Sequence, residues 1–170
     1  CSAAALALDD SKLEISAANT RGIGITVGTT FGSLHSISQF DRSGLLDGPR
    51  LVNPSHFPNT VINSPASQVA IRFTVKGFNT TISTGFCASM DAVAYATDFI
   101  RMGRAQAVLA GGVEELCEET FLLFHTQGCL SGMSGTEPVS RPFDADRDGF
   151  ILSEGAALLV LEEEEHARSR

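Results

Sequence analysis

Cys87 is the residue whose position in this sequence best suits covalent chemistry. It follows a Thr- and Ser-rich segment and a turn at Gly85, and a helical pattern begins directly after it at Ala88. The first turn of a helix has N–H groups without intrahelical partners and carries positive partial charge, and both favour a thiolate over a thiol. A thiolate can accept an acyl group, and the same N–H groups can donate to an oxyanion. Cys87 is therefore the candidate nucleophile.

The competing interpretation of each cysteine is packing. A free cysteine is among the most buried residue types and usually acts as a small apolar side chain, so position alone leaves both roles of Cys87 open. Cys117 and Cys129 lack the helix-start context, and we expect them to be packed in the core. No CxxC pair occurs, so we expect no metal site, and the sequence indicates no cofactor. The low cysteine content favours a reducing, cytoplasmic location.

Composition and charge narrow the class of protein. Apolar residues make up 43% of the 170 residues and charged residues 19%, which is ordinary for a globular domain. The formal net charge is −8, and no apolar run approaches the roughly 20 residues of a membrane helix. We therefore expect no nucleic-acid partner and no membrane partner. Because the chain starts at Cys1 and LEEEEHARSR ends it within a helical pattern, we expect residues 1–170 to form a single but incomplete domain.

Strand and helix patterns alternate along the sequence. Apolar or β-branched segments predict strands at 23–27, 80–84, 105–110, 150–152 and 156–161. Helical patterns occupy 2–8, 37–46, 60–73, 88–102, 118–124 and the final acidic run, where Glu164 and Arg168 are spaced to pair. Continuous apolar strands are typical of a sheet covered on both faces. The predicted fold class is therefore α/β, with a mostly parallel sheet between layers of helices.

Three stretches, in order along the chain, resemble β-ketoacyl-acyl carrier protein synthases. The segment GFCASMDAVAYATDFIRMGRAQAVLAGGVEE, residues 85–115, is similar to the family's nucleophile helix and the AGG-x-E ending of the following strand. Residues 140–170, SRPFDADRDGFILSEGAALLVLEEEEHARSR, resemble its RPFD-x-x-RDGF stretch. Upstream, IGITVGTTFGS and the segment around Pro58 resemble its first strand and pocket segment. The resemblance covers nearly the whole chain.

The resemblance implies a thiolase-like fold, of which this chain would be the N-terminal half, with a mostly parallel mixed sheet layered between helices. It implies transfer of an acyl group from an acyl carrier protein to Cys87. A decarboxylative Claisen condensation would follow, with malonyl on the phosphopantetheine of the carrier protein, in fatty-acid or polyketide synthesis. It also implies a homodimer, an oxyanion contact from the Cys87 N–H, and an acyl pocket lined near Val61, where a core role is equally open.

The sequence departs from the family pattern in two respects. The residue before the nucleophile is usually small, whereas here it is Phe86, which would narrow or reshape the acyl pocket. The family's second half supplies catalytic histidines and a lysine, and none of His35, His56, His125 and His166 matches those positions. We therefore expect residues 1–170 alone to be inactive in condensation.

Two functions other than a β-ketoacyl synthase are alternatives for this sequence: a non-catalytic partner subunit and a thiolase. A non-catalytic partner subunit, like a chain-length factor, generally lacks the cysteine, so Cys87 argues against it and Phe86 favours it. A thiolase is disfavoured by the RPFD…RDGF stretch. The other matched residues are expected to be structural. Gly111 and Gly112 allow close backbone packing, Asp144, Arg147 and Asp148 form a cluster of paired charges that orders a loop, and Glu154 is a buried, paired carboxylate.

Overall fold

A four-stranded sheet forms the centre of the computed structural model, which describes residues 1–170. Its strands lie in the order β2–β1–β3–β4, and they are β1 (Ile23–Gly28), β2 (Asn79–Ile82), β3 (Ala107–Glu114) and β4 (Gly155–Glu162). β1 is parallel to both β2 and β3, whereas β4 is antiparallel to β3. The predicted α/β class, with a mostly parallel mixed sheet, is confirmed.

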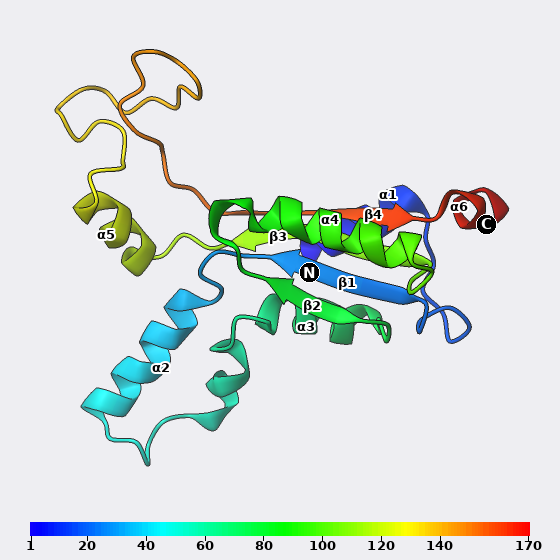
Figure 1. Cartoon of the computed structure of the whole chain (residues 1–170). Coiled ribbons are helices and arrows are strands. Elements are labelled where there is room, and N and C mark those ends of the chain that lie inside the picture. The colour runs from blue at the N-terminus through cyan, green and yellow to red at the C-terminus, as the bar shows by residue number, and fades with distance from the viewer.

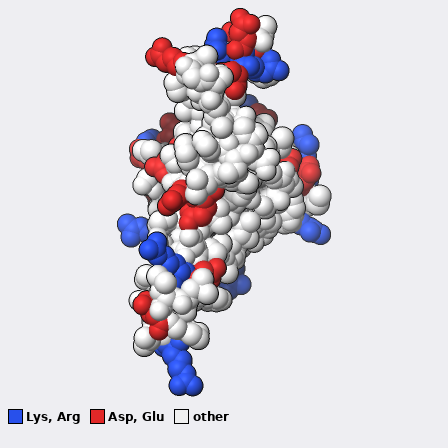
Figure 2. Space-filling model, turned by 90° about the vertical axis from the view of Figure 1, so that its left-hand side faces the viewer, with Lys and Arg blue, Asp and Glu red and all other residues white.

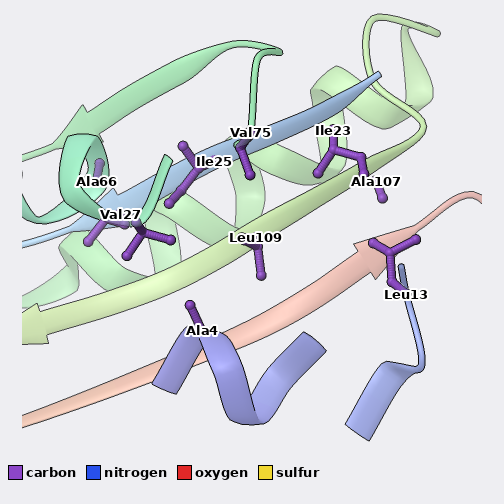
Figure 3. Close-up of a cluster of buried hydrophobic side chains, with 10 residues drawn as sticks. Ala4, Leu13, Ile23, Ile25, Val27, Ala66, Val75, Ala107 and Leu109 are labelled. Carbon is purple, nitrogen blue, oxygen red and sulfur yellow. The ribbon is translucent and has the colours of Figure 1, made fainter. Parts of the chain in front are cut away.

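Helices cover both faces of this sheet. Helix α4 (Ala88–Arg101) lies across one face, and α1 (Ser2–Ser11) and α3 (Ser64–Phe73) lie against the other (Figure 1). Alternate residues of a strand point to opposite faces. Ile25 and Leu109 therefore pack with Ala4 in one buried cluster (Figure 3), while Val108 packs with Ala96 of α4 in a second cluster. Because the buried side chains alternate between the two faces, each face of the sheet packs against its own layer of helices.

Several elements extend beyond the carboxyl ends of the parallel strands. They are α2 (Leu34–Leu46), the 3₁₀ helix η1 (Pro54–Asn59), α5 (Glu118–Thr126) and the loop of residues 127–154. The strand predicted at 150–152 is wrong, because Phe150 makes only a single bridge to Leu130 and no neighbouring strand continues the ladder. The 3₁₀ helix η1 forms although two prolines, Pro54 and Pro58, lie within it, because Pro54 occupies its first turn. No helix combines the length and apolarity needed to cross a bilayer.

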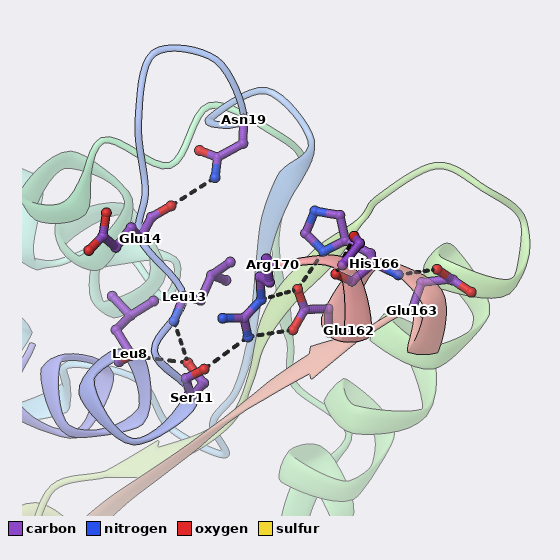
Figure 4. Close-up of polar contacts among 10 residues, drawn as sticks. Leu8, Ser11, Leu13, Glu14, Asn19, Glu162, Glu163, His166 and Arg170 are labelled. Carbon is purple, nitrogen blue, oxygen red and sulfur yellow. Dashed lines mark hydrogen bonds and ion pairs between the residues drawn. The ribbon is translucent and has the colours of Figure 1, made fainter.

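A polar network joins the opposite end of the sheet to α1. The Arg170 guanidinium donates two hydrogen bonds of 2.7 Å to the Glu162 carboxylate, and its Nη2 donates to the Ser11 carbonyl at 2.9 Å (Figure 4). His166 of α6 (Glu164–Ser169) also contacts Glu162. Bonding to Arg170 is the main cause that lowers the pKa of Glu162. The predicted Glu164–Arg168 pair is also present, on the exposed side of α6.

Candidate active site

A tight turn after β2 places Cys87 at the start of α4. Gly85 adopts φ +77°, a conformation that glycine reaches without strain. Gly85 is also the first residue of a single 3₁₀ turn, η2 (Gly85–Cys87). Cys87, the last residue of η2, is the N-cap residue of α4. Its thiol is free and the residue is exposed. The predicted strand–turn–helix arrangement around Cys87, called the elbow below (residues 83–89), is confirmed, and the nucleophilic role of Cys87 stays a prediction.

Glycines let the elbow approach the sheet closely. A side chain at Gly28, the last residue of β1, would collide with the backbone of Ala88 and Ser89, and one at Gly112 of β3 would collide with the Ser89 hydroxyl. A side chain at Gly111 would collide with the carbonyl of Ala157 in β4. The predicted packing role of Gly111 and Gly112 is confirmed.

A cleft of about 590 Å³ opens beside the elbow, at the carboxyl ends of β1 and β3. Phenylalanines from four segments line it: Phe31 after β1, Phe86 in the elbow, Phe124 of α5, and Phe150. The Phe124 ring centroid lies 6.0 Å from that of Phe31, 5.9 Å from that of Phe86 and 5.1 Å from that of Phe150. Such an apolar wall with a few polar groups is the usual make-up of a small-molecule site.

The three residues predicted for the site lie in different surroundings. Phe86 lines the cleft and is 80% exposed, so its ring is available to a ligand. Cys87 is not one of the lining residues, although Phe86 before it and Ala88 after it are. Val61 precedes α3, is 39% exposed and does not line the cleft. The structure therefore places Phe86 at the cleft and Cys87 at its margin, and it does not bring Val61 to them.

Sequence reasoning missed Phe31 and Phe124 as parts of the cleft. Phe31 lies in GTTFGS directly after a strand, which is the signal that could have placed it at the carboxyl edge of the sheet. Phe124 gives no such signal. It lies in α5, and the position of this helix beside the cleft depends on the direction that the chain takes after β3.

Comparison with known proteins agrees with this architecture. Residues 1–167 match the family profile "Beta-ketoacyl synthase, N-terminal domain". The 3-oxoacyl-[acyl-carrier-protein] synthase 2 of Vibrio cholerae is 38% identical over 168 residues, which cover 96% of this chain and 40% of the relative. The chain thus spans about two fifths of the length of that relative.

The chain belongs to the β-ketoacyl synthase family.

Two solved family structures are similar in fold. One is a type II polyketide ketosynthase bound to the hexaketide, in complex with its acyl-carrier protein; its TM-score is 0.85 at 29% identity, covering 98% of this chain and 43% of that one. The other is the ishigamide ketosynthase/chain length factor, with a TM-score of 0.85 at 34% identity, covering 98% of this chain and 41% of that one. The thiolase-like fold predicted for this family member is therefore shown.

Two other cysteines of this β-ketoacyl synthase domain, Cys117 and Cys129, have structural surroundings. Cys117 is buried at the start of α5, where its N–H donates to the Thr120 hydroxyl at 3.2 Å and its carbonyl accepts from the same hydroxyl at 2.9 Å. Cys129 is half-buried, and its Sγ lies 3.7 Å from the Gln127 carbonyl. Neither residue lines the cleft. The buried position expected for Cys117 is confirmed, while Cys129 is only partly covered.

The loop between α5 and β4 is ordered around Asp148. Its carboxylate accepts from the Ser131 hydroxyl at 2.6 Å, the Thr136 hydroxyl at 2.8 Å and the Gly132 N–H at 3.1 Å. These bonds, above all that from Ser131, lower the pKa of Asp148 to about 2. Arg147 donates to the Asp144 carbonyl at 2.8 Å. The ordering of the loop is confirmed, but the predicted pairing of charges is wrong, because the partners of Asp148 and Arg147 are hydroxyls and backbone groups.

The predicted burial of Glu154 is wrong. The residue is exposed, and its carboxylate has one long contact, 3.4 Å from the Leu116 N–H. The prediction placed Glu154 between two apolar strands, but only the strand after it forms, because β4 begins at Gly155. The side chain therefore stays in solvent.

The end of the domain that carries the cleft is sparsely charged. Figure 2 turns the left-hand side of Figure 1, where the parallel strands end, toward the viewer. Most of this surface is uncharged, with an acidic patch near its middle and basic side chains around it. Few of the charged side chains that give the net charge of −8 therefore lie on the face that carries the cleft.

Proposed function

We propose that this chain is part of a β-ketoacyl-acyl carrier protein synthase that holds an acyl group as a thioester on Cys87. The observation that carries this is a free, exposed Cys87 at the start of α4, between two residues that line an apolar cleft. The positive end of the α4 dipole favours a thiolate there. Phe86, which lines the cleft, would bind the acyl chain, whereas Val61, the second predicted contact, does not line this cleft.

The reaction proceeds in two halves. The Cys87 thiolate attacks the thioester carbonyl of an acyl-phosphopantetheine, a new S–C bond forms, and the phosphopantetheine thiolate leaves. Malonyl on a second carrier protein then loses carbon dioxide, and the resulting carbanion attacks the Cys87 thioester. The Cys87 thiolate is released and a β-ketoacyl chain remains on the carrier protein. The protein acts as a cytoplasmic homodimer in fatty-acid or polyketide synthesis.

The carrier protein is proposed as the partner because a family member of the same fold was solved in complex with its acyl-carrier protein. The acidic overall charge of this chain opposes an acidic carrier at long range, so contact would depend on the uncharged and basic parts of the cleft face.

A non-catalytic partner subunit is the second candidate. The observation that favours it is that Phe86, not Cys87, lines the cleft, so an apolar ring occupies the cleft-facing position of the elbow. A chain of this kind would shape the cleft without forming a thioester. One of the solved structures of similar fold is named a ketosynthase/chain length factor.

Acylation of the full-length protein separates the two candidates. We expect incubation with a hexanoyl-carrier protein, followed by peptide mass mapping, to place the acyl group on Cys87. Cys87→Ser should abolish the adduct, and the matched variant Cys129→Ser should retain it. The partner subunit would be supported if wild-type Cys87 carries no adduct while the thiol introduced by Phe86→Cys does. That result would show that the cleft binds the acyl group but that Cys87 does not react with it.

A further inference from the structure

We propose that Glu114, acting through Thr30, is a positioning residue that fixes the elbow on which Cys87 stands. The inference rests on the proposed function, because its catalytic consequence requires a thioester on Cys87. It concerns three segments that are distant in sequence and meet at the carboxyl edge of the sheet: the end of β3, the turn after β1, and the elbow after β2.

Glu114 is the last residue of β3 and binds the turn after β1. Its carboxylate accepts a hydrogen bond of 2.6 Å from the Thr30 N–H and one of 3.3 Å from the Phe31 N–H. The hydroxyl of Thr29, which is buried, lies 3.3 Å from each carboxylate oxygen. Hydrogen bonds to a charged acceptor are stronger than neutral ones. This carboxylate therefore holds the turn of residues 29–31 at the end of β3.

Thr30 carries the restraint on to the elbow. Its hydroxyl donates to the Gly85 carbonyl at 3.2 Å, and its own carbonyl accepts from the Ser83 hydroxyl at 3.2 Å. The amide, hydroxyl and carbonyl of Thr30 are thus all used, the first toward Glu114 and the other two toward the elbow. Thr29 also donates its N–H to the Ile82 carbonyl at 3.0 Å, but Ile82 lies in β2, before the elbow, so Thr30 is the residue of this turn that bonds to the elbow itself.

The elbow needs an external restraint because its turn contains a glycine. Gly85 has φ +77°, and a glycine in a turn reaches other conformations at little cost. Fixing its carbonyl fixes the direction in which the chain enters η2, two residues before Cys87. A displacement of about 1 Å in a reacting group can lower a rate roughly a hundredfold. Glu114 therefore acts on Cys87 indirectly, through Thr30 and the Gly85 carbonyl. Glu114 and Thr30 also line the cleft, so hydrogen exchange of the elbow is the readout that reports the positioning role.

The test uses the full-length protein and two readouts, amide hydrogen exchange of residues 83–89 and the rate of Cys87 acylation. Glu114→Gln and Thr30→Val should each speed exchange in this segment about tenfold and slow acylation by a similar factor. Thr30→Ser keeps the hydroxyl and should stay within about twofold of wild type in both readouts. Glu118→Gln, the same change on the exposed first turn of α5, should match wild type.

Three outcomes would overturn the proposal: unchanged exchange at residues 83–89 in Glu114→Gln, a Thr30→Ser variant as impaired as Thr30→Val, or exchange raised equally over the whole chain, which indicates general destabilisation. A wild-type protein that does not acylate Cys87 would sink the proposed function instead. In that case the exchange measurement still decides whether Glu114 and Thr30 fix the elbow.

Discussion

Gly28 of β1 and Gly112 of β3 lie opposite each other in the register of the sheet, and both face the first turn of α4. Because neither has a side chain, the helix that begins after Cys87 lies directly on the two strands. How closely the elbow approaches the carboxyl edge of the sheet therefore depends on this glycine pair.

Gly28→Ala should destabilise the protein by about 1–3 kcal/mol, as overpacking does in a close-packed interior. The added methyl group would meet the backbone of Ala88 and Ser89, which cannot rotate away as a side chain could. The urea midpoint of the full-length protein measures the effect. Gly155→Ala is the matched control, since a methyl group there meets nothing within 4 Å. Equal midpoint shifts in the two variants would contradict the proposed contact.

Phe86→Ala should widen the cleft while leaving stability within about 0.5 kcal/mol of wild type, because the ring is 80% exposed. We expect the preference for long over short acyl chains, measured as a ratio of acylation rates in competition, to rise about tenfold. Phe143→Ala removes a ring that is 100% exposed and outside the cleft, and should change neither property. An unaltered chain-length preference in Phe86→Ala would remove this residue from the substrate site.

Asp148 should make the loop sensitive to acid. Its pKa lies at about 2, below the ordinary 3.8, so the fold favours the carboxylate. The resulting stability is fully present above pH 3.8 and is lost as the pH falls through about 2. Asp148→Asn should lower the urea midpoint at neutral pH and flatten its decline in acid. Asp146→Asn, whose carboxylate accepts no hydrogen bond, should keep the wild-type profile, and a wild-type profile in Asp148→Asn would refute the assignment.

Glu162 should contribute through its contact with Arg170. The pKa of Glu162 is lowered from 4.5, so its contribution is present above that pH and declines as the pH falls below it. Its side chain is only 8% exposed, and we expect Glu162→Gln to cost about 2 kcal/mol in urea unfolding at neutral pH. Glu164→Gln breaks a largely exposed pair with Arg168 and should cost less than about 0.5 kcal/mol. Similar losses in both variants would show that burial adds nothing to the Arg170 contact.

Local pattern predicted much of this domain. The apolar spacing of residues 88–102 predicted α4, and Gly103, with φ +68°, follows the C-cap residue Met102. The alternation of strands with helices predicted the α/β class, and the motifs around Cys87 and Arg141 predicted the family. These features follow from sequence because helix periodicity, strand burial and turn glycines depend on residues close together in the chain.

Only the tertiary structure decided which segments meet. Residues 150–152 have a strand-like composition but form no strand, since a strand needs a neighbour to pair with, and Glu154 is exposed for the same reason. The position of Phe86 at the cleft, with Cys87 at its margin, follows from how α4 rests on Gly28 and Gly112. The bonds of Thr30 to Glu114 and Gly85 join segments more than fifty residues apart in sequence. Local sequence does not encode such contacts, because they form only when parallel strands bring their carboxyl ends to one edge of a sheet.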